Sequence, residues 1–386
     1  MPELSAGAAK VEITPKSPAH LAGYASRDEP SEGVHDPLFA RALMLDDGTT
    51  SICLASCDLC LLTTELHDEL RELIGAATGI DPANVLLATT HTHSGPVTRG
   101  ENVNAEWLEA FKYKMAYVAL LAQRRKRPAR IAFDSGSSDA GVNRREHKED
   151  GTTDLGANPD GFVDRELGVF RVEDESGAPL AVAWNYGCHG TLLGPKNYLI
   201  SADYMGVACH RVEQAMGDDV VAMFLSGGSG NVDPRHRVEP TPEHLEEVGR
   251  PVGEEVLRVL EDIGPGQTAD LAVTSSVIEV PRREEEVADG EPPMIDVPTW
   301  AFRIGETAVA TFPGELFAEI GANIKRRSMH PNTLVWSYCN GSVGYLPTAD
   351  SYPEGGYEIR TTHCAPEAEA IYAEGALQLL AQVASG

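Results

Sequence analysis

The sequence predicts an α/β fold of mixed sheets with flanking helices, and three observations support this. A pair of apolar segments joined by a glycine-containing turn occurs three times, a helix pattern follows each pair, and another apolar strand follows each helix. Alternating strand and helix patterns of this kind are typical of α/β proteins. We therefore expect three ββαβ-type units, a hypothesis about topology alone because the units share negligible sequence identity.

The elements of the three units can be placed in order along the chain. The paired strands cover residues 39–58, 167–189 and 299–315. The helix patterns that follow span residues 65–78, 203–216 and 316–327, and the closing strands span residues 85–90, 220–225 and 333–339. Glycine in the intervening turns favours hairpins, which supports antiparallel pairing of the first two strands.

Further helices are expected at residues 105–124, 242–261 and 366–383. The segment 281–298 is rich in proline and acidic residues, so we predict a surface loop or lid there, since buried charges would need partners. Residues 1–386 are interpreted as a single catalytic domain.

Composition narrows the class of partners. The net charge of -28 would repel phosphate backbones and anionic lipids, which makes nucleic acid and membrane surfaces poor partners. Residues 1–10 lack the pattern of a secretory signal, and the seven cysteines are an odd number, as expected for reduced buried thiols. Cys57 and Cys60 form a Cys-x-x-Cys pair that we interpret as structural. We expect a cytoplasmic protein with a small-molecule substrate, with a homo-oligomer left open.

Four short stretches carry chemistry, and each comes after an apolar strand. They are Thr90-His91-Thr92-His93-Ser94-Gly95-Pro96, Asn185-Tyr186-Gly187-Cys188-His189, Pro313-Gly314-Glu315 and Gly344-Tyr345. Open α/β sheets bind ligands beyond the carboxyl ends of their strands, so these side chains are expected around one centre. Imidazole, carboxylate and phenol groups can hold a transition metal, most plausibly zinc. In an extended segment His91 and His93 would point to the same side, so both can bind one metal, or one can face the substrate.

Taken singly, each signal has an ordinary structural explanation. A histidine after a strand, such as His189, is more often a satisfied core residue. Glu315 is expected to start a helix, where a carboxylate is favourable. Tyr345 alone would be a boundary aromatic. The prediction of a metal centre therefore depends on their joint placement.

The same segments resemble a known family. Together with Ile200-Ser201-Ala202-Asp203-Tyr204, the 226–234 loop and Tyr357-Glu358, they resemble, in the same order, the catalytic N-terminal domain of neutral/alkaline non-lysosomal ceramidases. The likeness extends from residue 6 to about residue 366. We expect a short single-domain member without a signal peptide or a carboxyl-terminal immunoglobulin-like domain.

The resemblance implies a zinc-dependent amidohydrolase that cleaves the carbon-nitrogen bond of an N-acyl group, here in a small soluble substrate. It implies zinc ligands at His91, His189, Glu315 and Tyr345. His93 would be an acid/base group, Arg144 and Tyr357 would address the substrate carbonyl or the oxyanion, and Ser229 would line the pocket. A zinc-bound water with a pKa near ~7 would supply the nucleophile, and positioned donors would stabilise the oxyanion.

Several alternatives stay open at this level. The same chemistry can cleave an ester, a lactone or a cyclic amide, and a relative that binds metal without catalysis is a further alternative. His93 can be a metal ligand rather than an acid/base group, and Asp58 or Asp203 can orient a ligand histidine. Ser229 lacks the Gly-x-Ser-x-Gly context of a serine hydrolase, and its loop lacks the ending of a phosphate-binding loop.

Overall fold

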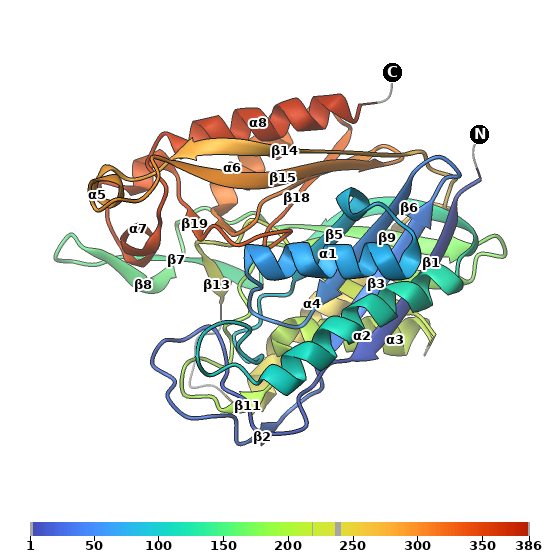
Figure 1. The fold of residues 1–386 in the computed structure, drawn as a ribbon, viewed down its shortest axis with the longest axis horizontal. Coiled ribbons are helices and arrows are strands. Elements are labelled where there is room, and N and C mark those ends of the chain that lie inside the picture. Colours follow the sequence, from blue (N-terminus) through green and yellow to red (C-terminus); the bar gives the residue numbers. More distant parts are fainter. Residues whose placement is uncertain (1–2, 218, 236–240, 385–386) are drawn as a thin grey trace.

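The computed structural model describes residues 3–217, 219–235 and 241–384. It contains the three predicted ββαβ units in chain order (Figure 1). The first is β3 (Phe39–Asp46), β4 (Ser51–Cys57), α1 (Thr64–Thr78) and β5 (Val85–Thr89). The second is β9 (Glu166–Asp174), β10 (Pro179–Tyr186), α3 (Asp203–Met216) and β12 (Val221–Ser226). The third is β15 (Met294–Ile304), β16 (Thr307–Thr311), α6 (Ala318–Arg327) and β18 (Asn332–Trp336).

Strand pairing confirms the topology within each unit. The first two strands are antiparallel, and the strand after the helix is parallel to the second strand. A parallel return of this kind needs a crossover, which the helix provides. Consequently the carboxyl ends of the second and third strands of each unit lie at the same edge of its sheet.

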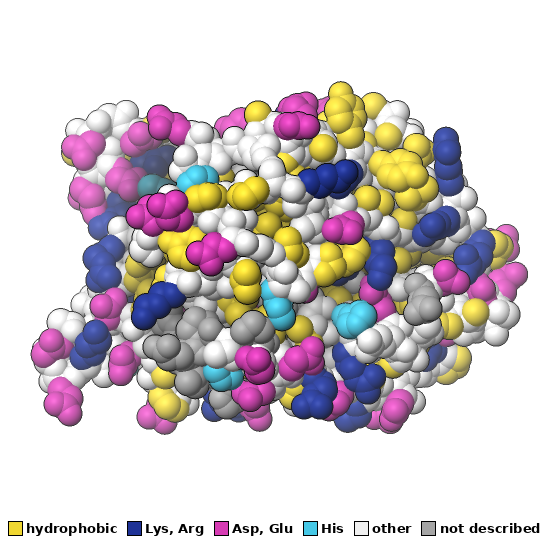
Figure 2. Space-filling view, turned by 90° about the horizontal axis from the view of Figure 1, so that it is seen from below, with side chains coloured by type: hydrophobic (Ala, Val, Ile, Leu, Met, Phe, Trp, Pro, Cys, Tyr) yellow, Lys and Arg dark blue, Asp and Glu magenta, His cyan; other side chains and the backbone are white. Residues whose placement is uncertain are grey.

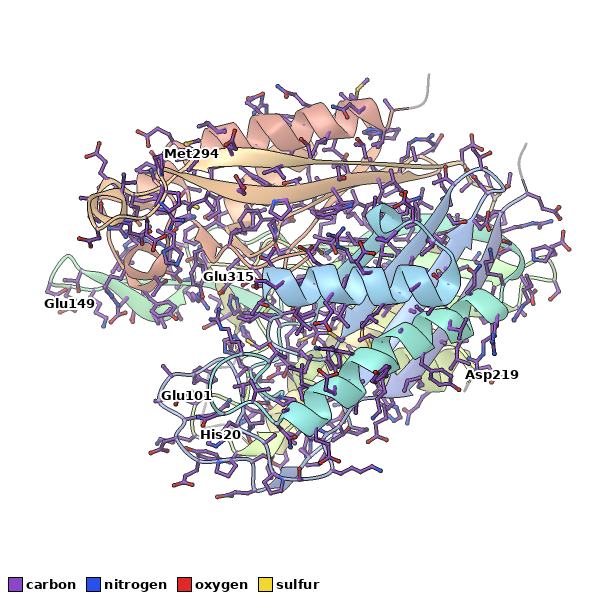
Figure 3. All side chains as sticks on the ribbon, viewed as in Figure 1. His20, Glu101, Glu149, Asp219, Met294 and Glu315 are labelled. Atoms are coloured by element: carbon purple, nitrogen blue, oxygen red, sulfur yellow. The ribbon has the colours of Figure 1, made fainter. Side chains whose placement is uncertain are left out.

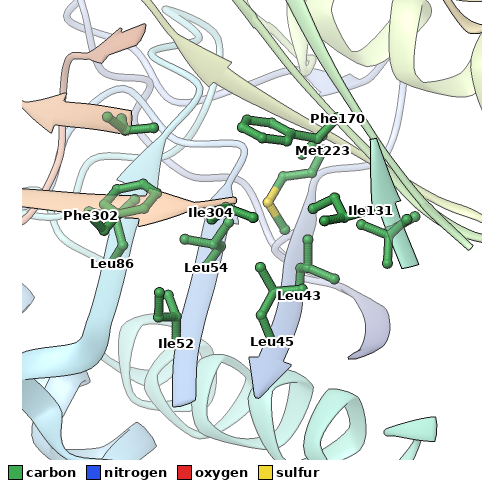
Figure 4. Packing of buried hydrophobic residues seen from close by; sticks show 14 of the residues in the cluster. Leu43, Leu45, Ile52, Leu54, Leu86, Ile131, Phe170, Met223, Phe302 and Ile304 are labelled. Carbon is green, nitrogen blue, oxygen red and sulfur yellow. The ribbon is translucent and has the colours of Figure 1, made fainter. Parts of the chain in front are cut away.

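Two sheets pack face to face. The larger has eight strands in the order β12-β10-β9-β6-β1-β3-β4-β5, where β1 is Ser5–Glu12 and β6 is Arg127–Ser137. The smaller has the order β14-β15-β16-β18, where β14 is Leu271–Pro281. Figure 4 shows their common core, in which Leu54, Leu86 and Met223 of the larger sheet lie near Phe302 and Ile304 of the smaller sheet. The first two units thus contribute to one sheet and the third to the other.

Helices cover the outer faces of both sheets and complete four layers (Figure 1). Helices α1 and α2 (Ala105–Arg124) pack on the β1-β3-β4-β5 part of the larger sheet. Helices α3 and α4 (Pro242–Asp262) pack on the β9-β10-β12 part. Helices α6 and α8 (Ala368–Gln382) cover the smaller sheet. No helix in the described part of the chain combines the length and the apolar character needed to cross a membrane.

Short elements connect the layers near the strand ends. They are β2 (Gly33–Val34), β7 (Gly141–His147), β8 (Thr153–Asn158), β11 (Leu199–Ile200), β13 (Val232–Pro234), β17 (Glu315–Leu316), β19 (Tyr345–Leu346), α5 (Glu284–Ala288), α7 (Tyr357–Thr361) and the 3-10 turns Pro82–Asn84 and Ala349–Ser351. All seven cysteines are buried free thiols in the structure.

Two local predictions are wrong. Glu315 does not start a helix: it lies in β17, which pairs with β19 so that Glu315 and Tyr345 are register partners, and α6 begins at Ala318. The segment 281–298 is not a loop throughout, because β15 begins at Met294 and pairs with β14 over its full length. Only the connection between these strands, which contains α5, lies outside the sheet; its role as a lid stays a prediction.

Candidate metal centre

Three of the four predicted ligands converge at the strand ends. His91 follows β5 and His189 follows β10, while Glu315 follows β16. The Nε2 atom of His189 lies 3.0 Å from Oε2 of Glu315, and Nε2 of His91 lies 3.6 Å from the same oxygen. Figure 3 shows Glu315 beside the end of α1 where that helix begins. The three units therefore each contribute a donor to one place.

Backbone carbonyls fix the orientation of both imidazoles. Nδ1 of His91 lies 2.7 Å from the carbonyl oxygen of Cys60, and Nδ1 of His189 lies 2.7 Å from that of Ser229. A carbonyl can only accept, so each Nδ1 carries a proton, and each Nε2 faces Glu315, where a neutral ring would present a lone pair. In that form two lone pairs and a carboxylate face one another, an arrangement that a cation would satisfy. This donor set fits zinc, whose protein ligands include imidazole nitrogen and carboxylate oxygen.

Carbonyls rather than carboxylates orient His91 and His189, so neither Asp58 nor Asp203 has the orienting role that the sequence left open for it. Asp58 accepts hydrogen bonds from the Phe39 backbone and from Arg41. Asp203 accepts from the backbone of Leu192 and of Tyr204. Both aspartates stabilise neighbouring backbone, and the imidazoles depend on the loops that carry the two carbonyls.

Electrostatics in the centre favour an ionised carboxylate, with His189 and His93 neutral. Burial acts to raise the pKa of Glu315, but the neighbouring His189 and His91 outweigh it and hold that pKa well below its usual range. Burial lowers the pKa of His189, and it lowers the pKa of His93 well below the usual value with help from the neighbouring His91. Neutral imidazoles are the form that binds a metal. Burial acts to lower the pKa of His91, but the neighbouring Cys60 and Glu315 outweigh it and raise that pKa to about 10, so a bound metal would displace a proton from this ring.

His93 lies against the other two histidines but is held differently. Its Nε2 is 3.1 Å from Nε2 of His91, and the two rings are 4.7 Å apart. Its Nδ1 is buried and has no hydrogen-bond partner among the residues that the structure describes, unlike Nδ1 of the other two. The sequence predicts that the two rings share a side because the segment is extended, and that reason is wrong. His91 has a left-handed φ of 61°, so the segment is not extended there. The turn, not strand alternation, brings the rings together.

Arg144 connects the fourth predicted ligand to two buried carboxylates. From β7 its guanidinium donates to the Tyr345 hydroxyl at 3.0 Å, to Glu358 at 2.7 Å and to Asp233 at 3.2 Å. The side chains of Arg144, Glu358 and Asp233 are all nearly fully buried. Arg144 thus reaches the centre through the oxygen of Tyr345, and a direct contact with a substrate carbonyl stays a prediction.

The remaining predicted site residues are Tyr357 and Ser229. Tyr357 begins α7 and is 36% exposed, with its ring 5.9 Å from that of Tyr345. Ser229 is fully buried, and its hydroxyl lies 3.0 Å from that of Tyr338, whose ring stacks on His91 at 3.9 Å. Ser229 therefore lies behind Tyr338, and its role in substrate binding stays a prediction.

Sequence reasoning missed Tyr338, whose ring forms a wall of the centre. Tyr338 and Asn340 follow β18 with left-handed φ angles of 58° and 55°. Bulky residues rarely adopt this conformation, and strain of this kind concentrates at functional sites. Nothing in the local pattern of residues indicates a left-handed tyrosine. The position of Tyr338 just after the β18 strand was the only signal in the sequence that could have pointed to the centre.

A cavity of about 760 Å³ opens beside these residues. Its inner wall includes His91, Glu315, Tyr338, Tyr345 and Tyr357. Charged side chains from the 96–104 loop and the α5 segment also line it. Figure 2 shows acidic side chains gathered at the left of the molecule, where Figure 1 places α5 and the β7–β8 hairpin. The centre is therefore reached through a partly charged opening.

Asp203 makes the stability of the fold dependent on pH. Burial raises its pKa from 3.8 to about 7. The folded state then holds this proton more tightly than the unfolded state, so the favourable contribution is present below about pH 4 and is lost as pH rises to about 7. We expect the difference in unfolding free energy between wild type and Asp203→Asn to change by roughly 4 kcal/mol at most across this range. Urea denaturation at both pH values measures it, and a constant difference would contradict the assignment.

Fold and site together define an α/β protein with a buried candidate centre for a transition metal at the ends of its strands. The family profile described as "Neutral/alkaline non-lysosomal ceramidase, N-terminal" matches residues 5–244, more than half of the chain. The chain belongs to this family. Glu315 and Tyr345 lie beyond the matched segment.

Individual relatives support the same family. Neutral ceramidase A of Dictyostelium discoideum is 29% identical over 247 residues, which are 58% of this chain and 34% of that protein. Neutral ceramidase of Pseudomonas aeruginosa is 27% identical over 252 residues, 61% of this chain and 37% of that protein. The chain thus aligns with about a third of the length of these relatives. The crystal structure of the Pseudomonas aeruginosa protein shares the fold across 100% of this chain and 75% of its own, with a TM-score of 0.82 at 19% identity.

Proposed function

We propose that this protein is a zinc-dependent amidohydrolase that cleaves an N-acyl bond of a small soluble substrate. The observation that carries the proposal is the convergence of the Nε2 atoms of two carbonyl-oriented histidines on the ionised Glu315. Membership of the ceramidase family supports amide hydrolysis as the reaction class. When bound, zinc would lower the pKa of a water molecule and polarise the scissile carbonyl.

Each of the proposed site residues would have a separate role in the reaction. His91, His189, Glu315 and Tyr345 would hold the metal. His93 is neutral and adjacent to the ligands, so it can take a proton and deliver it to the leaving nitrogen.

Two further residues serve the reacting groups from outside the ligand set. Arg144 holds the oxygen of Tyr345 in place through its guanidinium. Tyr357 lines the cavity and would donate to the developing oxyanion.

Metal analysis followed by a substrate panel tests this function. Purified protein should contain about one zinc ion per chain, and a chelator should abolish cleavage of N-acyl amines. Esters, lactones and cyclic amides in the same panel identify the scissile bond. Absence of tightly bound metal together with absence of chelator-sensitive turnover would overturn the proposal.

Seven buried free thiols are compatible with a reducing compartment, and we propose that the protein acts in the cytoplasm.

Gly23 provides a prediction specific to His93. A Cβ atom at Gly23 would lie 2.4 Å from Cγ of His93, and the residue has a φ of 97°. We expect Gly23→Ala to displace this ring and to lower turnover by roughly tenfold to a hundredfold while the protein keeps its zinc. Gly48→Ala is the matched control, because Gly48 has a φ of 85° and open space around it. Equal turnover in the two variants would argue against a role for the His93 ring.

A further inference from the structure

His67 is a buried titratable group at the cavity that the proposed mechanism does not use. It lies in the first turns of α1 and lines the same cavity as His91. The side chain is 1% exposed, and its Nδ1 has no hydrogen-bond partner among the described residues. Burial, with the nearby charge of Arg71, lowers its pKa to about 3, so the ring is neutral at physiological pH. A buried polar atom without a partner costs free energy unless a ligand or water satisfies it.

Arg99 lines the same cavity, and among the described residues no carboxylate forms an ion pair with its guanidinium. Its side chain is exposed. The other basic side chains of the lining differ, because Arg282 and His363 both contact Glu286. Arg99 is thus the guanidinium of this lining that is available to an incoming anion.

Hydrogen bonds join the segments that carry Arg99 and His67. The hydroxyl of Thr98 donates to the carbonyl of Leu61, and the His67 amide donates to the carbonyl of Thr63. The segment 58–63 thereby joins the two, and its Cys60 carbonyl orients the His91 ring. Figure 3 shows Glu101, in the loop that carries Arg99, at the same end of the molecule as Glu315. These segments are therefore continuous with the candidate metal centre.

We propose that His67 and Arg99 form a subsite for a carboxylate, so that the substrate is a small amide that also carries a carboxylate group. A guanidinium binds a carboxylate through charge-assisted hydrogen bonds, and a neutral imidazole can donate one more from its N–H. Leu61, Leu62 and Val343 line the cavity as well, which gives the intervening carbon atoms of such a substrate apolar contacts. The inference rests on the proposed function, since it names the substrate class of that site.

A matched pair of substrates tests the subsite. N-hexanoyl-leucine and N-hexanoyl-leucinamide differ in the carboxylate alone, and N-succinyl-hexylamine places the carboxylate on the acyl side. We expect Arg99→Gln to raise KM roughly tenfold for the carboxylate substrate that fits, with kcat unchanged, and to leave KM for the leucinamide as it was. His67→Phe should give the same split, and Arg250→Gln, an exposed substitution on α4, is the control.

The outcomes separate failure of the subsite from failure of the function. If wild type and Arg99→Gln show the same KM for every substrate, the subsite is wrong and the amidohydrolase stands. If no amide is cleaved, the proposed function fails, and calorimetric binding of N-hexanoyl-leucine and of N-succinyl-hexylamine decides the subsite. Weaker binding of either compound to Arg99→Gln than to wild type would still support it. Equal or absent binding of both would overturn it.

Discussion

His91→Ala is expected to purify with less than about a tenth of the zinc that the wild-type protein holds. His91 supplies one of the two nitrogens whose protonation is fixed by a carbonyl, and its Nε2 lies within 3.6 Å of Glu315. Without it, the remaining donors cannot complete the tetrahedral set that structural and catalytic zinc sites use. Metal content per chain, measured on folded protein by mass spectrometry, checks the result.

His93→Ala is the matched variant, because it removes the same ring two residues further on. We expect it to keep its zinc and to lose turnover by about 10²- to 10⁴-fold, the usual contribution of a general acid or base. The unpartnered Nδ1 of His93 is the basis of this difference, since the proposed ligands His91 and His189 have theirs held by carbonyls. Full metal retention in His91→Ala, or metal loss in His93→Ala alone, would reverse the assignment of the two residues.

The topology could be predicted because it depends on features that lie close together in the sequence. In β10, Leu180 to Trp184 form an uninterrupted apolar run, which is typical of a buried strand. The helix patterns and the glycine turns divide the chain in the same way. Such signals survive even though the three units share negligible identity.

The details of the centre depend on contacts between distant segments, which a linear pattern does not contain. Glu315 looks like the start of a helix because Pro313 and Gly314 precede it, yet its amide donates to the carbonyl of Gly344 and makes it a strand. The support of His91 by a Cys60 carbonyl likewise joins two loops that neither sequence segment specifies. The left-handed Tyr338 is imposed by tertiary packing, against its own backbone preference.

Arg144→Ala is expected to destabilise the fold by about 3–5 kcal/mol, the usual cost of removing one partner from a buried ion pair. The variant would leave the carboxylates of Asp233 and Glu358 buried without the guanidinium that both accept from. In this variant Glu358 still pairs with Arg145 at 3.0 Å. Because one of the two carboxylates keeps a partner, the loss of unfolding free energy can be as small as the lower end of this range. Urea denaturation of metal-free protein measures the loss independently of zinc binding.

Arg165→Ala is the control for this prediction, because Arg165 pairs with Asp139 at the surface, where both side chains are more than half exposed. An exposed pair contributes about 0–1 kcal/mol, so the two arginines should differ by several-fold in their effect on the free energy of unfolding.

Arg144→Lys separates charge from geometry: an ammonium restores part of the electrostatic balance but lacks the planar fork that reaches Glu358, Asp233 and Tyr345 together. We therefore expect it to recover stability in part while turnover stays low. If instead Arg144→Lys is as active as wild type, the guanidinium does not position Tyr345, and the phenol is held by other contacts.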